Sequence, residues 1–223
     1  MRKLTSFLLV SSLFLGACTF TLSYEEGSGK LERETRPIES IERINFEGIG
    51  NLVIEQGSQS TLEIEAEDNI LPRIVTSVHG DQLDIGFDTD RWENIIRPTR
   101  PITYYLTVEN LSELSLSGLG NVKLEGIEGD RLKIRLNGAG TIDASGAITQ
   151  QDINVSGAGS YDAGDLESDQ VSVNLSGAGN ATVWVNDLLD ISISGLGNVR
   201  YYGDPEVQQS ITGLGNIQAL GEH

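Results

Sequence analysis

The sequence predicts an all-β protein whose body is a right-handed parallel β-helix with coils of 18–20 residues. A Gly-x-Gly unit recurs along the chain, starting at positions 48, 118, 138, 157, 177, 195 and 213. The last six copies are separated by 20, 19, 20, 18 and 18 residues, and a fixed period near 20 is typical of a solenoid. Apolar and polar residues alternate around each unit, and no stretch has a helical period, which favours strands. The right-handed winding follows from the general preference of parallel crossovers.

The first 18 residues predict a lipoprotein signal peptide. Arg2 and Lys3 precede an apolar run that is too short to span a bilayer, and the run ends Leu15-Gly16-Ala17-Cys18. This ending resembles the bacterial lipobox. The resemblance implies removal of residues 1–17, lipid on Cys18, and a place in the bacterial cell envelope outside the cytoplasm, with the membrane contacted through that lipid. Cys18 is also the one cysteine of the chain, so no internal disulfide is expected.

Residues 18–40 are polar and aperiodic and include Gly27-Ser28-Gly29, which predicts a flexible tether. The domain is expected to span residues 41–223. Within it, residues 41–54 predict two strands around the first Gly-x-Gly, and residues 61–66 and 82–87 alternate as half-buried strands do. Pro72 argues against a long helix in residues 70–75.

Residues 88–101 interrupt the pattern and form the one basic, aromatic segment of an acidic chain. Its candidate binding residues are Arg91, Trp92, Arg97 and Arg100. As a site, this segment would suit an anionic sugar or the acidic face of a partner protein. The alternative, which we favour, is a surface loop whose tryptophan packs on the edge of the coils.

From residue 102 onward, each coil repeats two apolar positions before the Gly-x-Gly and two after it. We expect these positions to form a shared core, because one coil cannot bury its apolar side alone. The expected core residues are Leu114, Leu116, Val122, Leu124, Ile134, Leu136, Ile142, Ala144, Ile153, Val155, Tyr161, Ala163, Val173, Leu175, Ala181, Val183, Ile191, Ile193, Val199 and Tyr201. We expect glycine to supply positive φ angles at the corner, and the asparagine after it to tolerate the left-handed region and hydrogen-bond the next coil.

The residue between the two glycines defines what we call the corner column: Ile49, Leu119, Ala139, Ala158, Ala178, Leu196 and Leu214. Strict alternation would place this column outward and leave an apolar stripe that a partner or a second copy would cover. We favour the opposite, that alternation resets at the first glycine and the column points inward, because two inward glycines would leave a void in each coil. On this interpretation, Ala158→Asp buries an unpaired charge and destabilises the domain.

The formal charge is −18, which excludes nucleic acid as a partner and opposes adhesion of the domain body to anionic lipid. Asp143 and Asp162 occupy equivalent positions in successive coils and should be stacked neighbours, with Lys123 one coil earlier. Like charges so placed repel unless a cation or Lys123 offsets them. Because calcium takes six to eight oxygen ligands, two carboxylates are few, and we expect solvated acids without a metal or cofactor.

Residues 41–220 resemble a family of bacterial surface proteins, the auto-transporter adhesins with a head GIN domain, which is a domain of unknown function. The resemblance is carried by the repeated Gly-x-Gly units and by four segments: Asp68-Asn69-Ile70-Leu71-Pro72-Arg73-Ile74, Gly80-Asp81-Gln82-Leu83-Asp84-Ile85, Tyr105-Leu106-Thr107-Val108 and Leu111-Ser112-Glu113-Leu114. It covers most of the chain after Cys18. It implies a right-handed parallel β-helix and a surface role, but no binding residue.

No catalytic motif is found. His79 and His223 have no zinc-ligand spacing, and the Gly-x-Gly units lie between strands and not before helices, unlike phosphate-binding loops. Acids are scattered about one per strand, whereas cleavage of a polysaccharide needs two or three grouped carboxylates. We therefore expect a non-enzymatic, lipid-anchored binding or scaffold protein, with a glycan or a cell-surface protein as partner. The alternatives are a polysaccharide-active β-helix enzyme and an envelope sensor domain, and self-association is left open.

Overall fold

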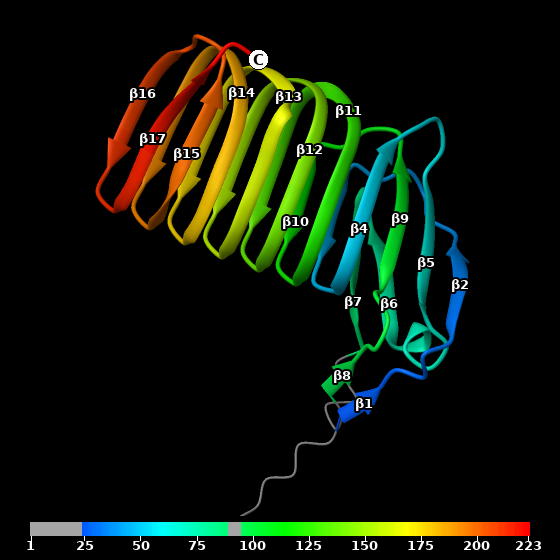
Figure 1. Ribbon diagram of the computed structural model, residues 1–223. Helices are drawn as coiled ribbons and strands as arrows, with labels where there is room; N and C mark the ends of the chain where they lie inside the picture. The colour runs from blue at the N-terminus through cyan, green and yellow to red at the C-terminus, as the bar shows by residue number, and fades with distance from the viewer. Residues whose placement is uncertain (1–23, 89–94) are drawn as a thin grey trace, which may run out of the picture.

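The computed structural model describes residues 24–88 and 95–223, and in these residues the chain is all-β. The one helical element there is a single 3₁₀ turn, η1 (Leu71–Arg73), which contains Pro72. The strands stack in parallel into a solenoid that fills most of the molecule (Figure 1). The predicted fold class, a parallel β-helix, is therefore confirmed.

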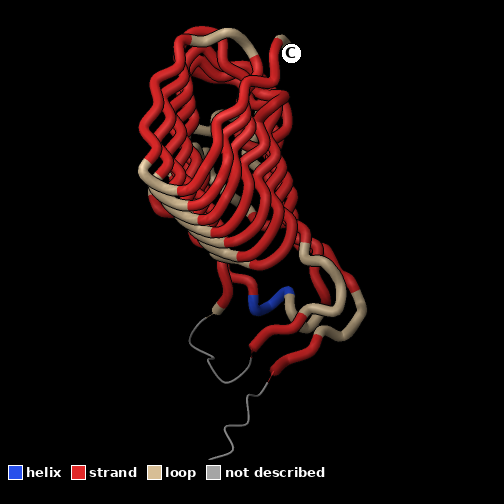
Figure 2. Tube along the Cα trace, turned by 60° about the vertical axis from the view of Figure 1, so that its left-hand side comes forward, coloured by secondary structure: helices blue, strands red, loops and turns tan. Residues whose placement is uncertain are grey.

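The regular coils begin at residue 113, and four long strands each run round most of one coil. The strands of this part are β10 (Glu113–Leu116), β11 (Leu119–Leu136), β12 (Ala139–Val155), β13 (Ala158–Leu175), β14 (Ala178–Ile193), β15 (Leu196–Tyr202), β16 (Glu206–Ile211) and β17 (Leu214–Gly221). Successive coils pair in the register that the repeat predicts, so that the Gly-x-Gly units align from coil to coil. In Figure 2 the turns of these coils lie in a row along one edge of the tube.

The first coil is separated in sequence from the coil that covers it. β3 (Arg43–Phe46) and β4 (Ile49–Gln56) pair in parallel with β10 and β11, and Gly50 aligns with Gly120. The chain between them turns back to close this end of the solenoid. We call the following strands, together with β2 (Leu31–Arg36), the N-terminal cap: β5 (Thr61–Glu67), β6 (Ile74–His79), β7 (Gln82–Phe87) and β9 (Thr103–Val108). Its β2–β5, β5–β9 and β6–β7 pairs are antiparallel, so regular coils do not extend over all of residues 41–223.

The predicted flexible tether is wrong for the part of it that forms strands. All six residues of β2 pair with β5, and Arg33 hydrogen-bonds both Glu63 and Glu65 on that strand. β1 (Tyr24–Glu26) pairs in parallel with β8 (Ile95–Arg97). The acidic and basic residues that predicted a flexible tether thus form ion pairs between two strands at the edge of the sheet. Residues 18–23 lie outside the described part.

The predicted core is confirmed at every position of the repeat except Tyr201, which is half-buried. The buried columns run without a break from the N-terminal cap into the coils, and Phe46 packs edge-on against Tyr104 with ring centroids 5.2 Å apart. One continuous core, shared between neighbouring coils, holds the molecule together.

The glycines serve mainly for close approach and not for unusual dihedral angles. Of the Gly-x-Gly glycines only Gly50 and Gly140 have positive φ, and no described non-glycine residue does, so the expectation of left-handed asparagines is wrong. A Cβ atom on Gly120 or Gly159 would instead overlap the carbonyl oxygen of the glycine one coil earlier. The corner is therefore a place where the backbones of adjacent coils touch.

The corner column faces outward, which overturns the prediction that it points inward. Leu119, Leu196 and Leu214 are 56%, 55% and 76% exposed. Alternation continues through the glycines, so the glycines take the inward positions. The expected void is absent because the backbones approach closely and core side chains fill the remainder: Leu136 lies 3.0 Å from where a Cβ on Gly159 would stand.

Candidate functional site

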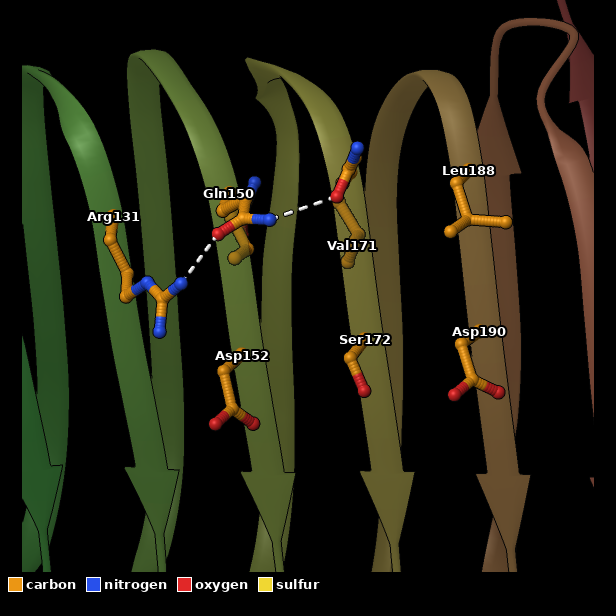
Figure 3. A pocket seen from close by; sticks show the side chains of 9 residues that line it. Arg131, Gln150, Asp152, Val171, Ser172, Leu188 and Asp190 are labelled. Carbon is orange, nitrogen blue, oxygen red and sulfur yellow. Dashed lines mark hydrogen bonds between the residues drawn. The ribbon is translucent and has the colours of Figure 1, made fainter.

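A groove on the outer wall of β11 to β14 is the candidate site. It has a volume of about 340 Å³. Its lining comes mainly from two outward-facing rows, which follow the register of the coils (Figure 3). We call it the polar groove, and its lining residues are Arg131, Gln150, Gln151, Asp152, Gln170, Val171, Ser172, Leu188 and Asp190.

The first row is a chain of hydrogen bonds that runs across three coils. Arg131 Nη2 donates to Gln150 Oε1 at 2.7 Å, and Gln150 Nε2 donates to Gln170 Oε1 at 2.8 Å. The chain orients both amides in one direction and leaves the amide nitrogen of Gln170 without a partner in the described residues. Leu188 occupies the next coil and gives the row an apolar end (Figure 3). The row therefore presents an oriented amide donor beside an apolar contact.

The second row, two residues further along each strand, supplies carboxylates and a hydroxyl. Asp152 accepts a hydrogen bond from Asn154 Nδ2 at 2.8 Å and lies 3.7 Å from Lys133 Nζ. The side chains of Ser172 and Asp190 form no hydrogen bond within residues 24–88 and 95–223. Together with Gln170 they offer free donors and acceptors on two adjacent coils.

A buried polar cluster lies behind the groove. Tyr161 Oη donates to Gln151 Oε1 at 2.7 Å, and Gln151 Nε2 donates to Ser168 Oγ at 2.5 Å, with all three residues buried. Burial raises the pKa of Tyr161, with a smaller contribution from Asp162, so its hydroxyl stays protonated and remains a donor. Gln151 occupies a core position where the neighbouring coils carry apolar residues. Tyr161 and Ser168 satisfy the hydrogen-bonding groups of the Gln151 amide, so the role of this cluster is structural.

The basic segment predicted as a candidate binding loop is not brought to the polar groove. Arg91 and Trp92 lie outside the described residues. Arg97 ends β8, and its guanidinium carbon lies 5.8 Å from the centre of the Tyr24 ring. Figure 1 shows β8 with β1 below the N-terminal cap, away from the coils of β11 to β14. Arg100 follows in the same segment, so the two described arginines belong to a separate surface.

The base of that segment is fixed by a residue that sequence reasoning missed. Glu67 is 1% exposed, and its carboxylate accepts hydrogen bonds from the backbone nitrogens of Gly29 and Thr99, at 2.6 and 2.8 Å. The Thr99 hydroxyl and the Arg100 nitrogen also donate to it, at 2.5 and 3.3 Å. Burial alone would raise the pKa of Glu67, but these four hydrogen bonds outweigh it and hold the pKa below its usual value.

Asp143 and Asp162 are paired neighbours on β12 and β13, as predicted, and Lys123 lies one coil before Asp143. Burial and the charge of Asp162 raise the pKa of Asp143, while Lys123 lowers it. Among the described residues, no group of three or more His, Cys, Asp or Glu side chains is arranged to hold a metal ion. The same residues contain no helix long and apolar enough to cross a membrane.

Comparisons with known structures show what this chain is similar to. A crystal structure described as a "putative adhesin" from Bacteroides fragilis has 23% identity and a TM-score of 0.74, with 88% of this chain and 100% of that one covered. A "putative adhesin" from Parabacteroides merdae has 22% identity and a TM-score of 0.53, with 89% and 99% covered. A "putative lipid binding protein" from Parabacteroides distasonis has 23% identity and a TM-score of 0.51, with 89% and 100% covered. At these identities the likeness establishes the fold alone.

A comparison with curated proteins gave no match. Residues 41–205, which include the polar groove, match the model of a protein family described as "Putative auto-transporter adhesin, head GIN domain". This match covers well over half of the chain. The chain therefore belongs to the head GIN domain family of putative auto-transporter adhesins.

Proposed function

We propose that this protein is a non-enzymatic, lipid-anchored binding protein of the cell surface, and that its polar groove binds a neutral glycan. The family match supports an adhesin-like role. The lipobox at Cys18 supports the anchor. The observation that carries the glycan assignment is the pair of rows in the groove, in which an oriented amide chain lies beside unpartnered hydroxyl and carboxylate groups.

The chemistry of the groove favours a neutral sugar over an anionic one. Sugar hydroxyls both donate and accept hydrogen bonds, so they match the amide of Gln170, the hydroxyl of Ser172 and the carboxylate of Asp190. Leu188 offers an apolar contact for the face of a sugar ring. Asp152 and Asp190, on a chain with a formal charge of −18, repel uronic acids and sulfated sugars.

If the protein were a polysaccharide-cleaving enzyme, Asp152 and Asp190 would be its pair of catalytic carboxylates. They stand two coils apart, about 10 Å between backbones at the usual strand spacing. A general acid needs a carboxyl that keeps its proton near neutral pH, usually because it is buried. Asp190 is exposed on the outer wall. We therefore assign the two carboxylates to hydrogen bonding of the ligand.

The test is a glycan array probed with the whole chain carrying Cys18→Ser, followed by a reducing-sugar assay on each sugar that binds. We expect binding to neutral glycans without release of reducing ends. The double variant Gln170→Ala/Asp190→Ala should weaken binding at least tenfold. The control Asn121→Ala removes an exposed amide from another face of β11 and should bind normally.

Three results would contradict the proposal. Release of reducing ends would make the protein an enzyme. Binding confined to anionic glycans would contradict the assigned class of ligand. Neutral-glycan binding that the double variant leaves unchanged would move the site away from the polar groove.

A further inference from the structure

The two ends of the solenoid are closed differently. At the C-terminal end, within the residues that the structure describes, β16 pairs only with β14, and β17 pairs only with β15. We call β16 and β17 the terminal coil. No strand of the described part of the chain covers its outer edge, so the backbone groups on that edge have no strand partner. An open strand edge of this kind is a template for pairing with another chain.

The terminal coil also exposes side chains that the preceding coils bury. Ile193 and Ile211 occupy equivalent positions, yet Ile193 is fully buried and Ile211 is 43% exposed. Val199 is likewise buried, while its neighbour Ile217 is only partly so. The open edge is therefore lined by apolar groups that one further layer of chain would cover.

Charge distinguishes the terminal coil from the other end of the molecule. β17 carries no charged residue, and β16 carries only Glu206. The N-terminal cap has two edge strands in the described chain, β2 and β6. β2 has the sequence Leu-Glu-Arg-Glu-Thr-Arg, and both of its arginines form ion pairs. β6 carries no Asp, Glu, Lys or Arg, but the Arg36 guanidinium donates to the Ile74 carbonyl oxygen at 2.8 Å and to the Thr76 hydroxyl at 3.2 Å on that strand. Charged residues on an edge strand oppose the addition of another strand. Charged side chains thus lie on or against both edge strands of the cap, whereas the terminal coil carries one charged residue.

We propose that the terminal coil is the docking surface for a second copy of this chain. Two copies, each with a formal charge of −18, repel one another over most of their surface, and the nearly uncharged terminal coil is where they approach at least cost. The charged side chains at the two edge strands of the cap oppose head-to-tail addition at the other end. The contact is therefore between two terminal coils, related by a two-fold axis, with their edge strands antiparallel.

In a dimer joined at the terminal coils, the partner in adhesion is a second copy of the same protein. This step of the inference rests on the lipid anchor of the proposed function. The described chain begins at Tyr24, at the end of the molecule opposite the terminal coil (Figure 1). A dimer joined at the terminal coils places the two Tyr24 residues at opposite ends of a rod, and the proposed anchor at Cys18 lies six residues earlier in each chain. Such a dimer connects two membranes. The inferred activity is self-recognition between apposed surfaces.

The first experiment measures self-association of the whole chain carrying Cys18→Ser by sedimentation equilibrium. A contact made by one coil of each copy is small, and we expect a dissociation constant on the order of micromolar. The dissociation constant should rise at least tenfold in each of two β16 variants, Gln209→Glu and Ile211→Glu, because each substitution places two like charges across the two-fold axis. Gln209 is exposed, so its substitution loses little packing, and urea unfolding confirms the fold of both variants.

The matched control is Val75→Glu, which adds the same charge at a 46% exposed apolar strand residue of the N-terminal cap. It should dimerise like the parent. A parent that stays monomeric at high micromolar concentration overturns the proposal. So does a dimer that survives both terminal-coil substitutions, or one that the control weakens equally.

The second experiment tests the connection of membranes. The parent chain is coupled through its single thiol, Cys18, to vesicles of uncharged phosphatidylcholine that carry a maleimide lipid. Light scattering should show clustering of vesicles that bear the parent, and no clustering with Gln209→Glu. A dimer that forms in solution without clustering the vesicles would contradict the end-to-end placement of the anchors. The groove variant Gln170→Ala/Asp190→Ala should cluster normally, which separates this proposal from glycan binding.

Discussion

Glu67 shows how much one side chain can organise when its neighbours are distant in sequence. Its carboxylate holds the backbone of residue 29 on one side and of residues 99 and 100 on the other. Residue 29 lies between β1 and β2, and residues 99 and 100 lie between β8 and β9, so Glu67 holds both connections against the N-terminal cap. A buried carboxylate stabilises the fold only when its hydrogen-bond donors compensate for its burial. If its charge is removed, some of the four donors lose the acceptor that they now have.

We expect Glu67→Gln to lower the free energy of unfolding by about 2–4 kcal/mol, because the amide nitrogen cannot accept the hydrogen bonds that one carboxylate oxygen now receives. Urea unfolding measures the change. The control is Glu63→Gln on the same strand, whose ion pair with Arg33 is partly exposed and should matter by less than about 1 kcal/mol. Equal effects of the two substitutions would contradict the role given to Glu67.

The same carboxylate predicts a loss of stability in acid. The pKa of Glu67 is lowered in the folded chain, so its contribution is fully present above the ordinary value of 4.5 and disappears as the pH falls through the lowered value. Urea midpoints measured between pH 7 and pH 3 should fall in the parent below about pH 4.5. The fall should be smaller in Glu67→Gln, and an identical fall in both proteins would show that other carboxylates govern it.

Glycine substitutions test whether close approach is the reason for the repeat. Gly159→Ala would drive a Cβ into the carbonyl oxygen of Gly140, so we expect a loss of about 2–4 kcal/mol. Gly129 lies in a strand without positive φ, and a Cβ there would meet only the side chain of Ile148 at 3.6 Å. Gly129→Ala should therefore be nearly neutral. Similar urea midpoints for the two variants would contradict the close-packing explanation.

At the scale of the element, the corner column shows that a strand can run through a Gly-x-Gly without a reset of alternation. Ala158 and Ala163 lie in one strand, β13, and face opposite sides of the wall. Two glycines on the inward side allow the chain to bend while adjacent coils remain in register. The exposed apolar stripe that results is narrow and flanked by neutral Ser, Thr and Asn side chains.

The two alanines make a matched pair for measurement. Ala158→Asp places the charge in water, and its effect on stability should stay within about 0.5 kcal/mol. Ala163→Asp places the same charge in the core, where the residue is fully buried, and should cost more than about 3 kcal/mol. Chemical denaturation of both variants decides the matter, and destabilisation by Ala158→Asp as large as that by Ala163→Asp would restore the inward orientation.

At the scale of the whole molecule, the start of the described chain in β1 and the terminal coil lie at opposite ends (Figure 1). The lipid that we propose on Cys18 is therefore decisive for the adhesive role that we infer. Cys18→Ser should move the protein from the detergent phase to the aqueous phase in a partition assay, because stable anchoring depends on the acyl chains. Ser23→Ala, five residues further along, is the control and should partition like the parent. Persistence of Cys18→Ser in the detergent phase would assign the anchor to another part of the chain.

The sequence by itself determined the coils and their core. A period of 18–20 residues with period-2 alternation places Ile134, Ile153 and Val173 in one column, and only stacked parallel strands bury such a column. The neighbouring position of Asp143 and Asp162 follows from the same count. These predictions succeed because in a solenoid the spatial neighbour is always one period away in the chain.

Only the tertiary structure decided the features that depend on pairing at other distances. β3 lies against β10, although 70 residues separate the Gly-x-Gly units that follow these two strands. β2 pairs with β5 in an antiparallel arrangement, which the period of the repeat does not predict. Glu67 carries no signal in sequence because its four donors come from two remote segments. The direction of the corner column was also undetermined, since the sequence does not show whether alternation continues through the Gly-x-Gly or resets at the first glycine. The close approach of the backbones in adjacent coils decides that it continues. The polar groove likewise depends on the register between coils, which places the outward-facing residues of four coils side by side.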